Sequence, residues 1–140
     1  MSAEAGANRR NAIVAERVAE TGVDEAMIAG LIQAFYARVR ADALLGPVFE
    51  AHIADWDEHL ARLTAFWSSI ALMSGRYGGK PMQAHLPLDI GPRHFERWIA
   101  LFAETAAEVC PPAAAAFFAD RARQIGAQLQ ATLAAVRAAP

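Results

Sequence analysis

Four aromatic side chains that carry a polar atom stand out in this sequence because the residues around them are apolar. Tyr36, His59 and Trp98 each fall on the apolar side of a predicted helix, where a polar atom needs a hydrogen-bond partner. His85 lies among glycines and prolines, on a short stiff element that Pro87 prevents from continuing as a helix. Taken singly, each is explained by a satisfied core group or, for His85, by an exposed loop histidine. Together they indicate a polar site inside an apolar core.

The residue types in this set favour one kind of cofactor. A bare metal ion usually takes three or four protein ligands, and the predicted interior offers imidazole without a companion carboxylate or thiolate. A haem iron needs a single axial histidine, and an apolar slot between helices buries the rest of the group. The P-loop, the dinucleotide fingerprint, H-E-x-x-H and G-x-S-x-G are all missing from the sequence. Five carboxylates are predicted to cap helices or face solvent: Asp55, Asp57, Glu58, Glu96 and Glu104.

The stretch from Asp55 to about Met73 predicts the helix that carries His59. Asp55 is its expected N-cap, with Glu58 three residues later as a variant of the capping box. Helical periodicity places one set of residues on the buried side, namely Trp56, His59, Leu63, Phe66, Trp67 and Ile70. The same periodicity places a second set on the outer side, namely Asp57, Glu58, Arg62, Thr64 and Ser68. This helix is therefore expected to form one wall of the site.

The same periodicity predicts three further long helices. The first is capped by Asp24 and ends near Asp42, and the second begins at Pro92. Pro111-Pro112 ends the second and begins the last, which is rich in alanine and runs to the C-terminus. Residues 1–20 have only a weak helical pattern and predict a loosely docked helix or a frayed arm. The expected fold class is all-α.

Two segments are predicted to interrupt the helices. In residues 44–49, Gly46-Pro47 is expected to break helix structure and form a tight corner, with Phe49 turned into the core. Residues 74–91 contain several glycines and prolines, so we expect no more than one helical turn there, at Met82–Leu86. This segment is too apolar to be simply solvated and is expected to lie across the core.

Composition sets outer limits on function. The chain has 140 residues, enough for one domain, with 55% hydrophobic residues, a net charge of −2 and an isoelectric point of about 6.1. Nothing in this charge predicts binding to nucleic acid or to an anionic membrane. There is neither a run long enough to span a membrane nor an apolar signal sequence, so a cytoplasmic location is expected. Cys110 is the single cysteine and is expected to be a small apolar filler.

The sequence resembles the truncated haemoglobins, most closely their group III. The resemblance covers about residues 24–136 and rests on the order and spacing of these short matches: Phe35-Tyr36, Leu45-Gly46-Pro47-Val48-Phe49, Trp56 with His59, Phe66-Trp67, Tyr77 through Pro81-Met82, His85-Leu86 and Phe95-Glu96-Arg97-Trp98. It implies a truncated globin fold, a two-over-two helical sandwich around haem. The expected division is an N-terminal extension at 1–22 and a globin domain at 23–138.

The resemblance also implies roles for individual residues. His85 is similar to the proximal iron ligand and Phe49 to the phenylalanine that packs on the porphyrin, with haem b as the cofactor. Further cofactor contacts are expected from Leu63, Phe66, Trp67, Tyr77 and Met82. The residues that resemble the distal set around a bound gas are Tyr36, His59 and Trp98. His59 could donate to the ligand, swing aside as a gate or bind the iron as a sixth ligand.

Other polar residues have less defined expectations. His52 and His94 match no ligand position and are expected at the surface. Candidate partners for the haem propionates, by closeness in sequence, are Arg76, Tyr77, Lys80 and Arg93.

The expected function is binding of oxygen and other diatomic ligands at a penta- or hexacoordinate haem iron with a polar distal pocket. Donors at Tyr36 and Trp98 predict slow ligand release, which suits redox chemistry such as conversion of nitric oxide to nitrate or reduction of peroxide. A reductase would then be the electron donor. The alternatives are an oxygen or small-ligand carrier or sensor without turnover, and a helical bundle without a cofactor. The sequence leaves the oligomeric state open.

Overall fold

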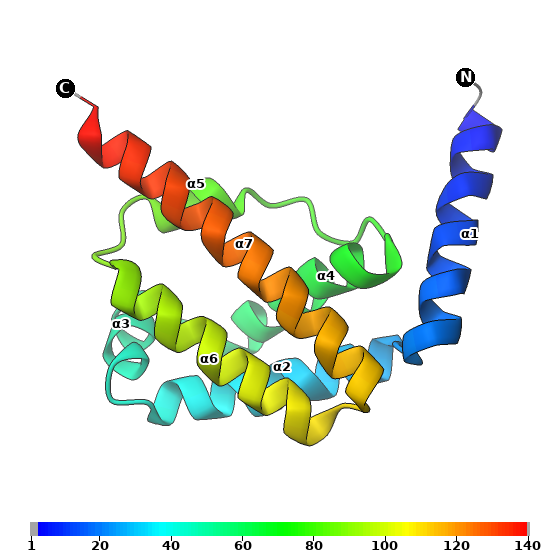
Figure 1. Cartoon of the computed structure of the whole chain (residues 1–140). Coiled ribbons are helices and arrows are strands. Elements are labelled where there is room, and N and C mark those ends of the chain that lie inside the picture. Colours follow the sequence, from blue (N-terminus) through cyan, green and yellow to red (C-terminus); the bar gives the residue numbers. More distant parts are fainter. Residues whose placement is uncertain (1–2, 140) are drawn as a thin grey trace.

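The computed structural model describes residues 3–139, apart from the side chain of Met82, so the predicted cofactor contact of Met82 lies outside what it describes. Residues 3–139 form helices and no strands, which confirms the all-α fold class (Figure 1). In chain order the helices are α1 (Ala3–Thr21), α2 (Glu25–Ala41), α3 (Leu45–His52), α4 (Trp56–Leu72), α5 (Pro81–His85), α6 (Pro92–Val109) and α7 (Pro112–Ala138).

Helices α2 and α4 begin where the sequence predicts. The Asp24 carboxylate accepts a hydrogen bond from the Met27 backbone N–H at 2.8 Å, and the Asp55 carboxylate accepts one from the Glu58 N–H at 3.1 Å. Helix α4 ends at Leu72, just before the predicted boundary. The two helices pack together, and α2 also packs across α6. One pair of the sandwich is therefore α2 with α4.

Helix α3 corrects the prediction of a helix-breaking corner at Gly46-Pro47. Both residues lie inside its first turn. Proline is tolerated there because the first backbone N–H groups of a helix have no partner within that helix. The preceding turn is closed instead by the Asp42 carboxylate, which accepts hydrogen bonds from the N–H groups of Leu44 at 3.1 Å and Leu45 at 3.0 Å.

The second pair of the sandwich is α6 with α7, which lie against each other along their length (Figure 1). Their separation is small at Gly126, where a Cβ atom would meet Ile99 Cδ1 at 2.9 Å. The core between the two pairs is aromatic: Phe102 stacks on Trp67 with centroids 4.9 Å apart and on Trp98 with centroids 5.5 Å apart. This column joins α4 to α6 and fixes the position of Trp98.

Helix α1 is a helix rather than a frayed arm, and it projects from the rest of the molecule (Figure 1). None of its described residues is buried. Arg17 attaches it to α4, because its guanidinium donates to the carbonyls of Ile70 at 3.1 Å and Ala71 at 2.6 Å. The same group lies 4.8 Å from the centre of the Phe117 ring on α7.

The segment between α4 and α6 contains the single short helix expected there, α5. It is tied to α4 by the Tyr77 backbone N–H, which donates to the Ser69 hydroxyl at 3.0 Å. Ser68, predicted on the outer side of its helix, is instead fully buried and donates to the Glu25 carboxylate at 2.5 Å. The side of α4 away from the cavity is therefore covered by α2 and by the start of this segment.

Two composition-based expectations have structural counterparts. Cys110 is buried, and burial raises the pKa of its thiol above the usual range. Within residues 3–139, none of the helices has the length and apolarity that crossing a membrane requires.

Candidate functional site

A cavity of about 450 Å³ lies between the two helix pairs, within the size range of small-molecule sites. Its lining is mostly apolar. One wall comes from α2, α3 and α4: Tyr36, Leu45, Val48, Phe49, His52, Ile53, His59, Arg62, Leu63, Phe66 and Trp67. The facing wall comes from the segment after α4 and from α5 to α7: Tyr77, Gly79, Lys80, Pro81, Ala84, His85, Leu88, Ile90, His94, Phe95, Trp98, Ile125, Gly126 and Leu129.

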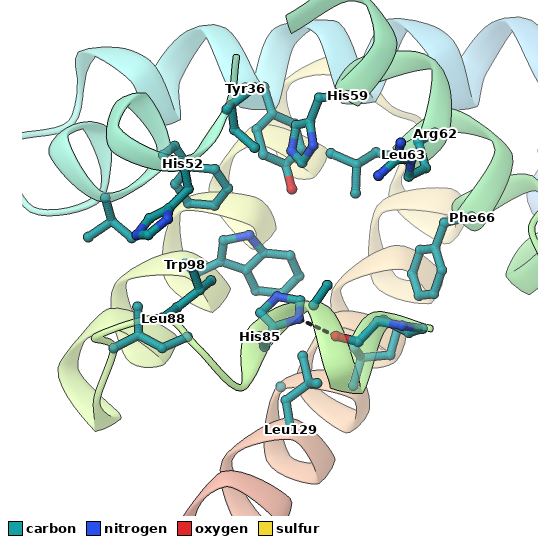
Figure 2. A pocket seen from close by; sticks show the side chains of 18 of the residues that line it. Tyr36, His52, His59, Arg62, Leu63, Phe66, His85, Leu88, Trp98 and Leu129 are labelled. Atoms are coloured by element: carbon teal, nitrogen blue, oxygen red, sulfur yellow. Dashed lines mark hydrogen bonds between the residues drawn. The ribbon is translucent and has the colours of Figure 1, made fainter. Parts of the chain in front are cut away.

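His85 is the last residue of α5 and is half-buried in the facing wall. Its Nδ1 lies 2.5 Å from the carbonyl oxygen of Pro81, one turn earlier in the same helix (Figure 2). Because a carbonyl only accepts hydrogen bonds, Nδ1 must carry the hydrogen. In the neutral ring, Nε2 therefore keeps a free lone pair, as a metal ligand requires.

Tyr36 and Trp98 bring two further polar side chains to the cavity. Figure 2 shows Tyr36 and His59 across the cavity from His85, with Trp98 between them at one side. Tyr36 is only 4% exposed, and this burial raises the pKa of its phenol well above the usual value. A hydrogen bond with Trp98 opposes the shift. Since an indole N–H can only donate, the Tyr36 oxygen accepts this bond, and its own O–H hydrogen remains to be donated.

His59 contributes a buried polar atom that the protein does not satisfy. Its Nε2 has no hydrogen-bond partner within the described residues, in a ring that lines the cavity. Desolvation by burial lowers the pKa of His59, and the charges of Arg62 and His85 lower it further. The ring is therefore held in its neutral form, with a nitrogen available to a group inside the cavity.

Aromatic contacts hold the opposite wall in place. The Tyr36 ring makes edge contacts with Phe49 and with His59, each with centroids 5.7 Å apart. Phe66 and Tyr77 meet edge to face at 5.2 Å and join α4 to the segment that leads to α5. Such rings leave the polar atoms few alternative positions.

The cavity brings together most of the residues that the sequence singles out. The described ones that line it are Tyr36, Phe49, His59, Leu63, Phe66, Trp67, Tyr77, His85 and Trp98. Of the suggested propionate partners, Tyr77 and Lys80 line the cavity, whereas Arg76 donates to the Glu25 carboxylate at 3.3 Å and Arg93 is exposed.

Three polar residues have roles that the sequence prediction missed. His94, predicted at the surface, is half-buried and lines the cavity, and its Nδ1 accepts a hydrogen bond from the Gly91 backbone N–H at 3.0 Å. His52 is exposed as predicted, yet it also lines the cavity (Figure 2). Arg62 is exposed on α4 one turn after His59 and reaches the cavity rim. Its spacing from His59 was the available signal, because residues three apart share a helix side.

The arrangement fits a haem group. One imidazole nitrogen with a free lone pair faces a buried nitrogen without a partner, and the space between them is lined by aromatic and aliphatic groups. No cluster of three or more histidine, cysteine or acidic side chains suitable for a bare metal ion occurs among the described residues. The fold and the cavity together define a helical haem protein of the globin class.

Comparison with known proteins supports this class. Residues 19–117 match the family model of the bacterial-like globins. Over 88 residues the chain is 39% identical to the group 3 truncated hemoglobin ctb of Campylobacter jejuni, covering 59% of this chain and 69% of that protein. The crystal structure of a group III truncated hemoglobin from Campylobacter jejuni aligns with a TM-score of 0.74 and 34% identity, over 79% of this chain and 91% of that one.

The chain belongs to the truncated haemoglobin family of bacterial-like globins, and it is similar to group III members of that family. Membership implies a haem cofactor and binding of diatomic gases at it. The truncated globin fold predicted from the sequence is confirmed.

Proposed function

We propose that this protein holds haem b through His85 and binds oxygen and other diatomic ligands on the side of Tyr36, His59 and Trp98, where it serves redox chemistry. The observation that supports this proposal best is the opposition across one cavity. His85 lies on one side with its Nδ1 bonded to Pro81, Tyr36 and His59 lie on the other, and Trp98 lies between them at one side of the cavity.

His85 is suited to the role of axial ligand by its local structure. The hydrogen bond from Nδ1 to the Pro81 carbonyl fixes the tautomer and the ring plane. It also makes Nε2 a stronger electron donor, since the partially shared hydrogen leaves more charge on the ring. Proline at the start of α5 and the short length of this helix keep the acceptor carbonyl in place.

The distal residues supply hydrogen-bond donors in a water-poor space. Tyr36 stays protonated at physiological pH because burial raises its pKa, so it remains a donor. The Trp98 indole orients the phenol by donating to its oxygen. Phe49 and Leu63 complete an apolar surrounding in which each hydrogen bond to a polarised ligand is stronger than in water. These contacts favour retention of the ligand over rapid release.

When bound, haem supplies the iron at which oxygen is activated. Two reactions fit the site: nitric oxide and oxygen combine to form nitrate with uptake of one electron, or hydrogen peroxide is reduced to water with two electrons and two protons. The chain's own part is to exclude water and to place beside the ligand the Tyr36 hydroxyl, oriented by Trp98, and the neutral imidazole of His59. A reductase would supply the electrons.

Absorption spectroscopy tests the proposal. The purified protein is expected to show a Soret band, and His85→Gly is expected to lose it and to regain it when imidazole is added. His94→Gln is the matched control, because His94 lines the same cavity but has its Nδ1 occupied by Gly91. A Soret band that survives in His85→Gly without imidazole would contradict the ligand assignment.

Rapid mixing separates turnover from simple binding. The oxygenated protein is mixed with nitric oxide in the presence of a reductase, and nitrate is measured. Stoichiometric nitrate with repeated turnover supports the redox function. An oxygenated form that survives both nitric oxide and peroxide contradicts it and favours a carrier or sensor.

The role of His59 as a sixth ligand needs its own test. Its unsatisfied Nε2 suits direct coordination as well as hydrogen bonding to a ligand. Coordination predicts a low-spin bis-histidine spectrum in the ferric protein that is absent from His59→Ala. A high-spin ferric spectrum in the unaltered protein would show that His59 does not coordinate the iron, and would favour its hydrogen bonding to a bound ligand.

A further inference from the structure

Arg137, near the end of α7, binds the segment that follows His85. Its guanidinium donates to the carbonyl of Ile90 at 2.6 Å and to the carbonyl of Leu88 at 2.8 Å. Both carbonyls belong to the irregular stretch between α5 and α6, where no helix supplies partners for them. One side chain from the C-terminal helix therefore satisfies two backbone groups within five residues of the candidate iron ligand.

The contact continues directly to His85. The Leu88 backbone N–H donates to the His85 carbonyl at 3.1 Å, so Leu88 is bonded to Arg137 through its oxygen and to His85 through its nitrogen. On its other side, His85 is fixed by the bond from its ring to Pro81. The ring orientation thus depends on two supports, one inside α5 and one that leads to α7.

Helix α5 packs against α7 but is itself short. It has five residues and no side-chain cap at its N-terminus, where Lys80 stands. Apolar contacts hold the stretch after it, because Ile90 packs with Phe95 and Leu133 in a small cluster. Such contacts fix the position of Ile90 but do not fix the direction of the Leu88 carbonyl, because the hydrophobic effect is not directional. Charge-assisted hydrogen bonds from a forked guanidinium do provide direction.

We propose that Arg137 is a positioning residue for His85, acting through the backbone of Leu88 to hold the imidazole at the angle at which it binds the iron. The inference rests on the proposed role of His85 as the haem ligand. In this role, the last turn of the C-terminal helix affects the strength of the iron–histidine bond and the retention of haem, although it lies outside the cavity.

Arg17 provides a matched control for this role. It makes the same kind of contact, one guanidinium to two backbone carbonyls, but at Ile70 and Ala71 near the end of α4. A change of Arg17 to methionine therefore removes equivalent hydrogen bonds without touching the stretch that follows His85. Methionine retains an unbranched apolar stem and removes every donor.

The experiment compares Arg137→Met, Arg137→Lys and Arg17→Met in the full haem-loaded chain. The first readout is the iron–histidine stretching band in the resonance Raman spectrum of the ferrous, ligand-free protein. The second is haem loss to an excess of an apoglobin acceptor. For Arg137→Met we expect a shifted or broadened band and haem loss faster by about threefold to tenfold, with partial recovery in Arg137→Lys. For Arg17→Met we expect both readouts to match the unaltered protein.

Amide hydrogen exchange at Leu88 provides a readout that does not depend on haem chemistry. Its N–H is bonded to His85, so Arg137→Met should speed its exchange by about tenfold, whereas Arg17→Met should not. An unchanged band and unchanged exchange in Arg137→Met would overturn the inference, as would equal changes in Arg17→Met. Faster exchange at Leu88 with no iron–histidine band in the unaltered protein would instead contradict the proposed ligand.

Discussion

Single polar atoms decide what the cavity can bind. His85 keeps a free Nε2 because its Nδ1–H donates to the Pro81 carbonyl, and His59 keeps a buried Nε2 that nothing in the described chain satisfies. An unsatisfied buried nitrogen costs free energy in an empty core, so its presence indicates that a ligand completes the site. The sequence could place these residues inside by helical periodicity, but it could not show which ring nitrogen is free.

The Tyr36 hydroxyl, oriented by the Trp98 indole, predicts slow release of oxygen. Tyr36→Phe keeps a ring in the aromatic contacts and removes the donor, whereas Trp98→Phe keeps a ring and removes the hydrogen bond that orients the phenol. A lost hydrogen bond to a polarised ligand costs about 1.5 kcal/mol or more, so the dissociation rate should rise by about tenfold or more in Tyr36→Phe and by less in Trp98→Phe. Stopped-flow displacement of oxygen by carbon monoxide measures this rate.

Phe66→Leu is the control for this experiment, since Phe66 lines the cavity but has no polar atom. Its dissociation rate should change by much less than that of Tyr36→Phe. Unchanged rates in both Tyr36→Phe and Trp98→Phe would show that Tyr36 does not donate to the ligand and that its orientation by Trp98 has no effect on release.

The lowered pKa of His59 predicts a dependence of stability on pH. The unfolded chain has an ordinary histidine pKa near 6.5, whereas burial lowers the pKa in the folded protein. As the pH falls below 6.5, the unfolded state takes up the proton first, so the free energy of unfolding decreases until the folded pKa is passed. Above 6.5 the effect is absent, because both states are neutral.

The measurement compares the unaltered protein with His59→Gln by denaturant unfolding between about pH 7.5 and about pH 5.5. The difference between the two curves removes the contributions of groups that do not interact with His59. The unaltered protein should lose stability relative to His59→Gln on acidification. Parallel curves would show that His59 is not held neutral by burial.

Helix elements were predicted best where caps and apolar periodicity agree. Asp24, Asp55 and Pro92 each begin a helix as expected. Pro47 was misjudged, because proline disrupts a helix interior but is accepted in the first turn, and local sequence alone did not show which position it occupies. Ser68 was misjudged for another reason: α4 is covered on more than one side, so an amphipathic pattern underestimates its buried surface.

Gly46 lies at the corner where α3 follows closely on α2. A Cβ atom on Gly46 would lie 2.7 Å from the backbone oxygen of Arg40, which cannot move away as a side chain could. Gly46→Ala should therefore lower the free energy of unfolding by about 1–3 kcal/mol. Gly30→Ala is the matched control, because Gly30 is exposed within α2 with nothing within 4 Å of the added atom.

In that control, alanine should raise stability by about 1 kcal/mol through its higher helix propensity. Urea unfolding of both variants measures the difference. Equal effects of the two substitutions would show that the α2–α3 corner can accommodate the added methyl group despite the short distance to the Arg40 oxygen.

Across the whole molecule, the cavity depends on segments from nearly every part of the chain. The walls come from α2 to α4 on one side and from α5 to α7 on the other, and the C-terminal helix also reaches the stretch after His85 through Arg137. Helix α1 differs, since none of its described residues is buried and none lines the cavity. The division into an extension at 1–22 and a globin domain at 23–138 stays a prediction.

Removal of residues 1–21 tests that division. The chain would lose the Arg17 contacts to α4 and to Phe117, so the melting temperature should fall by about 3–6 °C. The Soret band and the oxygen dissociation rate should stay unchanged, because the cavity walls remain complete. Arg17→Met in the full chain is the control and should give a smaller fall, since the other α1 contacts persist. Loss of the Soret band in the shortened chain would mean that α1 belongs to the globin domain, with Arg17 holding the end of α4 in the position that the haem cavity needs.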